Sequence, residues 1–347
     1  MNKILATMVA FAMVMAVAVV PAMASTVTTS VTISTGGNPP VIKAKWEQDL
    51  TPSLEDGDPT HLITTQPGIG PNAQFLPPCA FQGKKPYQLY SVVTDAEEGG
   101  DVLSASADVY HPDGTFKYQI MQIKLDTAQS LAAFDAAWAA KLVTNSTLFT
   151  IADIRHEIEQ GTAKVWVGNA ELDYEQQSGT YRVDATAQDH NSNIAPVLTN
   201  YFTYVPTNCF DIDFTSVDFG AVTVGTPKKI NGNTFWETPF APAPTPNGAT
   251  VRNIGNTNLK VKLNFTDMDF GYSGVAPALT PNVQFDANLG LTGTNLIFDP
   301  FTTVTLPDVL QHSSQDKLDL SIHVKKGTGA HTGTLTLGSE IAPGWWP

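Results

Sequence analysis

The sequence has few charged residues for its length, and basic residues are the scarcer kind. Only 19 of the 347 residues are Lys or Arg, against 33 Asp and Glu, so the formal net charge at pH 7 is −14. Proteins that bind nucleic acid present a basic surface to the phosphates. The composition therefore argues against nucleic acid as a partner and is typical of a solvated extracellular surface.

Long apolar runs are also scarce, and the longest stands at the start of the chain. Ile4–Val20 is almost continuously apolar and ends at Pro21. Its length of about 17 residues is at the lower limit for a transmembrane helix, and residues 22–24 (Ala-Met-Ala) have the spacing that signal peptidase recognises. We expect residues 1–24 to be a secretory signal peptide, so that the mature protein is secreted and retains no integral membrane segment.

Cysteine occurs only twice, as Cys79 and Cys209. Outside the cytoplasm, an even pair of cysteines usually forms a disulfide. Such a bridge would close a loop of about 130 residues and contribute about 5 kcal/mol on the chain-entropy account. The alternative is two buried free thiols.

Motifs of the common enzyme classes are absent. The sequence has no nucleophile elbow, P-loop or dinucleotide fingerprint. The nearest approach to a zinc-protease motif runs from His156 to Gln160, and Gln160 stands where the second histidine ligand is required. We interpret this stretch as a polar helix face, and we predict a protein that is not an enzyme and needs no resident organic cofactor.

Alternating apolar and polar residues, which are typical of half-buried strands, dominate the chain after residue 79. A turn signal, Pro112-Asp113-Gly114, joins two of the expected strands. The strands expected in the first half are 87–94, 102–110, 115–125, 163–174, 180–188 and 197–205. The pattern predicts a mainly β fold.

The period changes to that of a helix within residues 127–161. Apolar residues three and four apart between Leu131 and Leu142 predict one helix, capped by Asp126 or Thr127. Thr150 and Asp153 have the spacing of a capping box for a second helix. We expect two short helices inserted between strands.

Two stretches carry a resemblance to known extracellular domains. The stretch 179–189 (GTYRVDATAQD) resembles the last strands of PKD-type and immunoglobulin-like domains, with Tyr181 at the place of their corner tyrosine. The segments 217–226, 251–261, 318–324 and 331–337 resemble Hydin-type immunoglobulin-like domains. The resemblance is to secreted prokaryotic cell-surface proteins with tandem domains. It implies two antiparallel β-sandwich (Ig-like) domains, 79–206 and 207–342, with a structural or adhesive role.

The segments outside these domains have their own composition. Residues 25–78 are rich in Thr, Pro and Gly and predict an extended arm. Its first part, 25–35 (STVTTSVTIST), has a strand-like pattern that could add to an open sheet edge of a neighbour. The tail 343–347 contains Trp345 and Trp346, which are candidates for contact with a partner or for packing on the second domain.

An acidic loop is the candidate metal site. Asp95, Glu97, Glu98 and Asp101 surround two glycines between expected strands, and calcium prefers such oxygen ligands. The EF-hand spacing is absent, and a solvated acidic loop is the alternative. Smaller acidic groups stand at 55–58 and at 211–213.

Two sequons predict N-glycosylation, at Asn145 and at Asn264. Asn145 stands between the two expected helices and Asn264 within an expected strand.

The features together favour a structural protein of a cell-surface layer, sheath or fibre, which self-associates or binds other surface proteins through its sandwiches and strand addition. The alternative is a secreted adhesin or carbohydrate-binding module. Sugar sites commonly present aromatic faces, and the candidate rings are those of Trp166, Trp236, Tyr272, Trp345 and Trp346.

Overall fold

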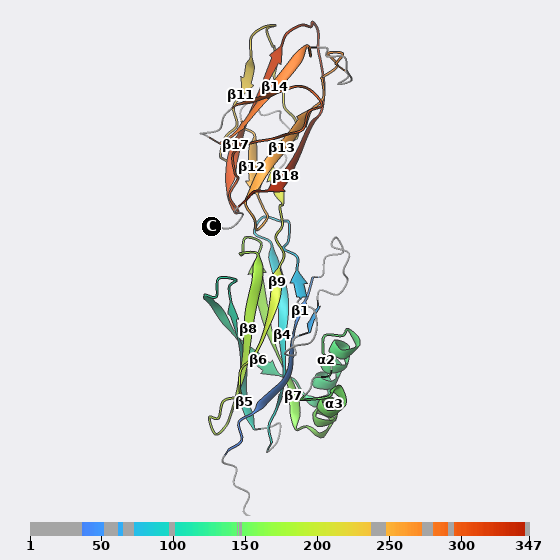
Figure 1. Ribbon diagram of the computed structural model, residues 1–347, viewed down its shortest axis with the longest axis vertical. Coiled ribbons are helices and arrows are strands. Elements are labelled where there is room, and N and C mark those ends of the chain that lie inside the picture. Colours follow the sequence, from blue (N-terminus) through green and yellow to red (C-terminus); the bar gives the residue numbers. More distant parts are fainter. Residues whose placement is uncertain are drawn as a thin grey trace, which may run out of the picture. The chain divides into compact units, whose positions relative to one another are not determined.

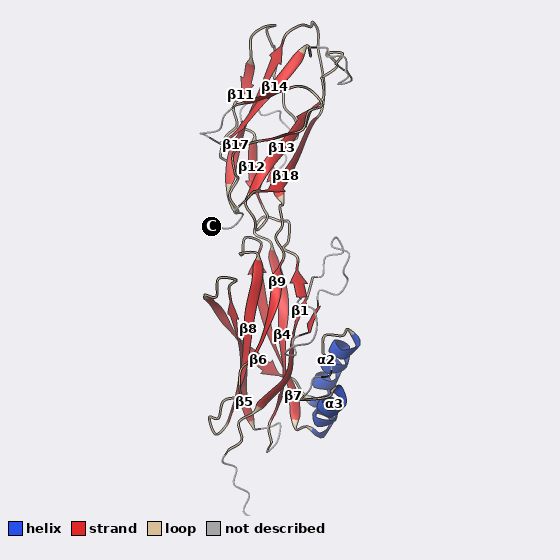
Figure 2. Ribbon diagram, in the orientation of Figure 1, coloured by secondary structure: helices blue, strands red, loops and turns tan. Residues whose placement is uncertain are grey.

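The computed structural model describes residues 37–51, 62–64, 73–96, 101–143, 145, 148–236, 248–272, 280–290 and 295–343. The expected signal peptide, the strand-like segment 25–35 and the tryptophans of the tail lie outside the described residues. The described chain is mainly β and forms two β-sandwiches, the first of which carries two helices (Figures 1 and 2). Among the described residues no helix has the length and apolar character needed to cross a membrane.

The first sandwich is built from one sheet that folds over on itself. Its strands follow the order β2-β1-β4-β7-β6-β5-β8-β9-β3. The described pairs are antiparallel except for β3 and β9, which run parallel. Because the sheet curls, β1 contacts β8 and β9, and β2 contacts β3. The strands are β1 (Val41–Asp49), β2 (Leu62–Thr64), β3 (Ala73–Phe75), β4 (Lys84–Thr94), β5 (Val102–Tyr110), β6 (Phe116–Lys124), β7 (Ala163–Asp173), β8 (Gly179–Asp189) and β9 (Leu198–Tyr204).

Strand β1 departs from the expected organisation. It pairs with β4 from Val41 opposite Thr94 to Asp49 opposite Tyr87, and with β2 on its other side. Residues 41–49, 62–64 and 73–75 therefore belong to the first sheet and not to an extended arm. The prediction was wrong here because β1 is buried on both faces, so its buried side chains include charged ones and the alternation of a half-buried strand is lost.

The two helices form as expected. Helix α2 (Thr127–Ala139) is capped by Asp126, and α3 (Ile151–Gln160) begins with the capping box of Thr150 and Asp153. Gly161 ends α3 in the left-handed region at φ 81°, where glycine carries no steric penalty. Both helices cover the outer face of β1, β4 and β7 (Figure 2), through a buried cluster that includes Trp46, Phe134, Ile154, Ile158 and Val165.

Aromatic side chains fill the interior of the first sandwich. The rings of Tyr181 and Phe202 stack with their centroids 5.0 Å apart, and Tyr87 and Phe75 pack beside Phe202. The Tyr181 hydroxyl donates to the carbonyl oxygen of Gln177 at 2.7 Å. This bond to a residue just upstream confirms the corner tyrosine.

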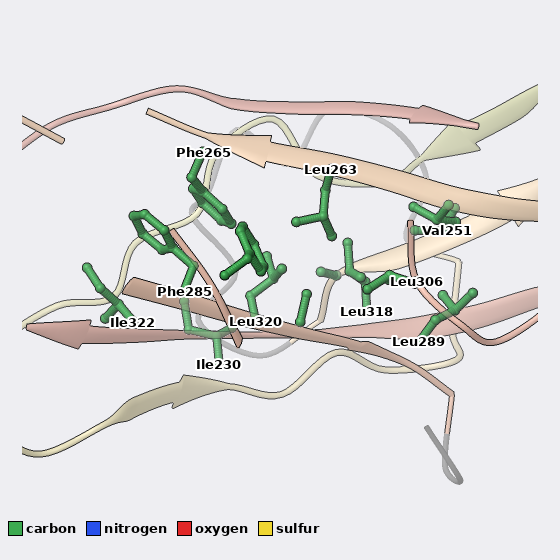
Figure 3. Close-up of a cluster of buried hydrophobic side chains, with 14 of the residues drawn as sticks. Ile230, Val251, Leu263, Phe265, Phe285, Leu289, Leu306, Leu318, Leu320 and Ile322 are labelled. Atoms are coloured by element: carbon green, nitrogen blue, oxygen red, sulfur yellow. The ribbon is translucent and has the colours of Figure 1, made fainter. Parts of the chain in front are cut away.

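The second sandwich consists of two sheets. One has the order β10-β12-β17-β14-β15, with β11 also paired to β17, and the other has the order β16-β13-β18. Between the sheets, Phe265 of β13 and Phe285 of β14 stack with their centroids 4.2 Å apart (Figure 3). The strands are β10 (Phe210–Ile212), β11 (Lys228–Ile230), β12 (Thr250–Asn253), β13 (Leu259–Phe265), β14 (Val283–Leu289), β15 (Leu296–Phe298), β16 (Val304–Thr305), β17 (Gln315–Val324) and β18 (Leu335–Ile341).

The segment 217–226, whose sequence resembles the first strands of Hydin-type domains, is not a strand in this structure. It runs as a loop that is tied to β17 where Gly225 N–H donates to the Val324 carbonyl oxygen. The strands nearest to it in sequence, β10 and β11, contain only three residues each. Val217, Phe219 and Val222 of this segment still pack against the second core, although the segment forms no hydrogen-bonded ladder.

The turn that follows β12 holds the chain between the sandwiches. Asn256 accepts a hydrogen bond from Thr207 N–H at 2.7 Å and donates one to the Val205 carbonyl oxygen at 3.0 Å. A Cβ atom on Gly255 would lie 2.2 Å from the Thr207 carbonyl oxygen. The Asn-x-Gly-Asn sequence at 253–256 therefore allows a backbone approach that no larger residue permits.

Candidate functional site

Three carboxylates meet where β4 ends, β5 begins and β8 ends. One oxygen from each of Asp95, Asp101 and Asp189 lies within 4.8 Å of the other two. Asp95 and Asp189 are buried and Asp101 is partly exposed. Of the four residues predicted for a calcium site, the structure brings Asp95 and Asp101 together, whereas Glu97 and Glu98 lie outside the described residues.

Sequence reasoning missed Asp189 as a member of this cluster, since β8 reaches the loop only through the pairing of Val102 with Asp189. Its carboxylate is held by Asn193, whose backbone and side-chain N–H groups donate at 2.8 and 2.7 Å. Burial favours the neutral acid, but these hydrogen bonds outweigh it and lower the pKa of Asp189. An ionised carboxylate beside two others is an arrangement that suits a divalent cation with oxygen ligands.

The other acidic pair has structural partners. Asp211 forms an ion pair with Arg252 at 3.2 Å, and Asp213 accepts a hydrogen bond from Thr250 N–H at 2.7 Å. These contacts tie β10 and its following loop to β12. The acidic group at 55–58 lies outside the described residues.

The asparagines of the two sequons differ in their surroundings. Asn145 is exposed, and its side-chain oxygen accepts a hydrogen bond from Ile151 N–H at 2.7 Å, next to the start of α3. Asn264 is half-buried and donates to the Thr303 hydroxyl at 3.2 Å. Glycosylation stays a prediction at both positions, and Asn145 has the more accessible side chain.

The aromatic rings proposed for a sugar site do not form one surface. Trp166 is buried in the first sandwich among β-strand side chains. Trp236 lies over the Arg252 guanidinium with 3.7 Å from ring centroid to Cζ, and Phe81 covers that group at the same distance. Tyr272 belongs to a loop of the second sandwich, and Trp345 and Trp346 lie outside the described residues.

A hollow of about 630 Å³ opens in the second sandwich instead. Its base is formed by Ile322 and Val324 of β17, and the loops 217–224, 268–270 and 327–333 surround it. Apolar side chains dominate the lining, while Asp218, Thr328 and His331 supply polar groups.

Glycines shape this hollow. Phe270 and His331 stack with their centroids 3.8 Å apart. A Cβ atom on Gly327 would lie 2.5 Å from the Phe270 ring, and one on Gly333 would lie 2.5 Å from the Thr266 hydroxyl. The sequence signal for the site was therefore the glycine-rich stretch at 327–333, which reads in isolation as an ordinary hairpin loop.

A disulfide joins Cys79 to Cys209, with the two Cα atoms 5.6 Å apart. Cys79 precedes β4 of the first sandwich, and Cys209 precedes β10 of the second. Both cysteines are used in this bridge. The bridge encloses every residue of β4 to β9 in one covalent loop.

No protein-family model and no curated protein matches this chain. Among solved structures, a chain of the CsuC–CsuE chaperone–tip adhesion subunit pre-assembly complex from the archaic chaperone-usher Csu pili of Acinetobacter baumannii is similar at 11% identity and a TM-score of 0.31, covering 78% of this chain and 97% of that chain.

Two further structures are similar at the same identity of 11%. The C-terminal domain of the Streptococcus pyogenes antigen I/II-family protein AspA has a TM-score of 0.21 and covers 87% of this chain and 95% of that chain. The CupB6 tip adhesin from Pseudomonas aeruginosa has a TM-score of 0.19 and covers 74% of this chain and 84% of that chain. These scores are too low for the neighbours to assign a function to this chain.

Proposed function

We propose that the protein is an exported, non-enzymatic adhesin that binds its ligand in the hollow of the second sandwich. The observation that carries this proposal is the convergence of three loops around an apolar floor with polar groups at its rim. Binding sites for small ligands are commonly concave and mainly apolar, with a few polar groups that fix orientation. The expected signal peptide and the acidic surface agree with a place outside the cell.

A cell-surface glycan is the ligand class that suits the hollow. Sugars pair an apolar face with hydroxyl groups, and the hollow offers the Phe270 ring beside Thr328, Thr332 and Asp218. The stacked His331 holds Phe270 in place, since its ring nitrogens lie 3.1 Å from the Met268 carbonyl oxygen and 3.3 Å from that of Thr328.

A glycan array probed with residues 25–347 tests the proposal. We expect binding that His331→Ala weakens at least about tenfold, which corresponds to about 1.4 kcal/mol. The control is His156→Ala, because His156 is an exposed histidine on α3 in the other sandwich. An array without hits, or equal binding by both variants, would contradict the proposal.

Self-assembly into a surface layer or fibre is the second candidate function, and the edge of the three-stranded sheet favours it. Among the described strands, β18 pairs with β13 alone, so one edge of β18 has no strand partner there. An open edge accepts an added strand. The alternating residues 25–35 of another copy have the length and pattern to occupy it.

Light scattering on residues 25–347 and 36–347 tests this assembly. We expect the longer chain to form regular particles and the shorter one to stay monomeric. A chain in which 25–35 is scrambled keeps the composition and serves as the control. Equal association of all three chains would rule out strand addition by this segment.

A further inference from the structure

The interior of the first sandwich holds a lysine and an asparagine that both contact the same glutamate. Lys45 is 1% exposed, Glu47 is 0% exposed and Asn200 is 7% exposed. Nζ of Lys45 lies 3.0 Å from Oε1 of Glu47, and Nδ2 of Asn200 donates to Oε2 of the same carboxylate. An amine and a carboxamide thus share one buried carboxylate between them.

This group is poorly explained as a stabilising ion pair. Taking charges out of water costs several kcal/mol per ion, and apolar side chains of similar size often serve a core equally well. In addition, the side-chain oxygen of Asn200 is buried without a hydrogen-bond partner in the described structure. A buried polar atom left unsatisfied is costly and needs a reason.

The chemistry of the three groups supplies a reason. An amine and a carboxamide can condense to a secondary amide with loss of ammonia, and the reaction needs no oxidant and no second substrate. We propose that Lys45 and Asn200 become joined by an intramolecular isopeptide bond, with Glu47 as the acid–base group. The bond would form after folding, since β1 and β9 meet only in the folded sandwich.

The reaction converts the amine of Lys45 and the primary amide of Asn200 into one secondary amide and one molecule of ammonia. The lone pair on Nζ of Lys45 attacks Cγ of Asn200, and the Nζ–Cγ bond forms. Glu47 accepts a proton from Nζ and passes one to Nδ2 of Asn200. The Cγ–Nδ2 bond then breaks, ammonia leaves, and Nζ and Cγ remain joined as an amide.

The site meets the demands of this reaction. Burial lowers the pKa of Lys45, which favours the neutral amine that carries the nucleophilic lone pair, although the nearby Glu47 acts in the opposite direction. Nζ also contacts the Val183 carbonyl oxygen at 3.1 Å, so the amine is held in place. Holding both reactants together replaces a bimolecular encounter by a unimolecular step, and exclusion of water protects the intermediate from hydrolysis.

Intact mass spectrometry of the reduced, denatured chain 25–347 tests the proposal. We expect a mass below that of the sequence by one ammonia molecule, and a branched tryptic peptide that joins the segments around Lys45 and Asn200. Peptide mapping is required because asparagine can also lose ammonia by cyclising on its own backbone. A wild-type chain with unlinked peptides would overturn the proposal.

Variants separate the roles of the three residues. Lys45→Met and Asn200→Ala should lack the branched peptide, and Glu47→Gln should lack it or form it at least about a hundredfold more slowly, as is typical for loss of a general acid–base group. The matched control is Lys85→Met, because Lys85 is also buried and pairs with the buried Asp49 at 2.5 Å. It should keep the link. A normal rate of linkage in Glu47→Gln would remove Glu47 from the mechanism, and the wild-type peptide map decides the case if variants fail to fold.

Discussion

At the scale of single residues, the aromatic core of the first sandwich contains tyrosines whose hydroxyl groups form hydrogen bonds within the protein. The hydroxyls of Tyr87 and Tyr118 lie 2.7 Å apart, and that of Tyr204 donates to the Asp173 carbonyl oxygen at 3.1 Å. Because burial disfavours the phenolate, it raises the pKa of Tyr87 and Tyr204, and it raises the pKa of Tyr118 to about 12. The core therefore depends on its tyrosines remaining neutral.

Alkaline pH should destabilise this core. The folded pKa of Tyr118 lies above its unfolded value of about 10, so its contribution is complete below about pH 10 and is lost as the pH rises towards about 12. We expect the free energy of unfolding to fall by about 2 to 3 kcal/mol over this interval from Tyr118 alone. Urea unfolding followed by circular dichroism measures it. Tyr118→Phe should flatten the dependence, and an unchanged slope in this variant would contradict the assignment.

The carboxylates of Asp95, Asp101 and Asp189 make a prediction for calcium. Extracellular calcium modules bind with dissociation constants of about 0.1 to 1 mM, so about 10 mM calcium should stabilise the folded chain by about 1.4 to 2.7 kcal/mol. Thermal unfolding with calcium and with a chelator measures the effect. Asp101→Asn should abolish it, whereas Glu171→Gln, which removes an exposed carboxylate of β7, should leave it intact. Equal stability of the wild type in both buffers would show that the cluster is not a calcium site.

At the scale of elements, the helical insertion is held by its caps and by a short apolar stripe. Thr150→Ala should cost about 1 kcal/mol because the N–H of Asp153 loses its acceptor. Ile154→Ala should cost about 2 to 5 kcal/mol, since Ile154 is fully buried against β1 and β7. Denaturant unfolding measures both. Ala152→Gly is a control for helix propensity alone, with about 1 kcal/mol expected, and a cost for Ile154→Ala no larger than this would contradict the packing argument.

What the sequence could predict follows from how local each signal is. The caps of α3 and the corner Tyr181 depend on neighbours within four residues, and both predictions are confirmed. Strand β1 was missed because Lys45 and Glu47 are buried beside one another, and only the folded sandwich shows their partner Asn200.

The candidate sites were harder to predict from the sequence because their residues come together only through long-range strand pairing and loop packing. Asp189 reaches Asp95 only through the pairing of β5 with β8, and the hollow of the second sandwich combines loops more than one hundred residues apart. An alternating sequence pattern also predicts which side chains are buried better than it predicts whether the segment pairs with another strand. In the segment 217–226, Val217, Phe219 and Val222 pack against the second core, but the segment forms no hydrogen-bonded ladder.

At the scale of the whole molecule, the disulfide between Cys79 and Cys209 covalently links two distant parts of the chain. The two cysteines are 130 residues apart in sequence, and the disulfide closes the loop between them. Its removal should therefore lower the free energy of unfolding by up to about 5 kcal/mol. Unfolding of the wild type with and without reductant measures this loss. The double variant Cys79→Ser/Cys209→Ser should match the reduced wild type and should not respond to reductant. Equal stability of the oxidised and reduced wild type would contradict the expectation.

The same bridge decides which parts of the chain can bear a mechanical load. The shortest covalent route from Asn38 to Ala342 leaves the backbone at Cys79 and rejoins it at Cys209, so β4 to β9 and both helices lie off the route. Tension between these points would strip only β1, β2 and β3 from the first sandwich, and it would release a segment no longer than about 140 Å when fully extended. The bond proposed between Lys45 and Asn200 would take residues 46–49 of β1, together with β2 and β3, off the route and would bring residues 200–204 of β9 onto it. Tension could then release only residues 38–45 and 200–209 from the first sandwich, so the sandwich would extend much less under load.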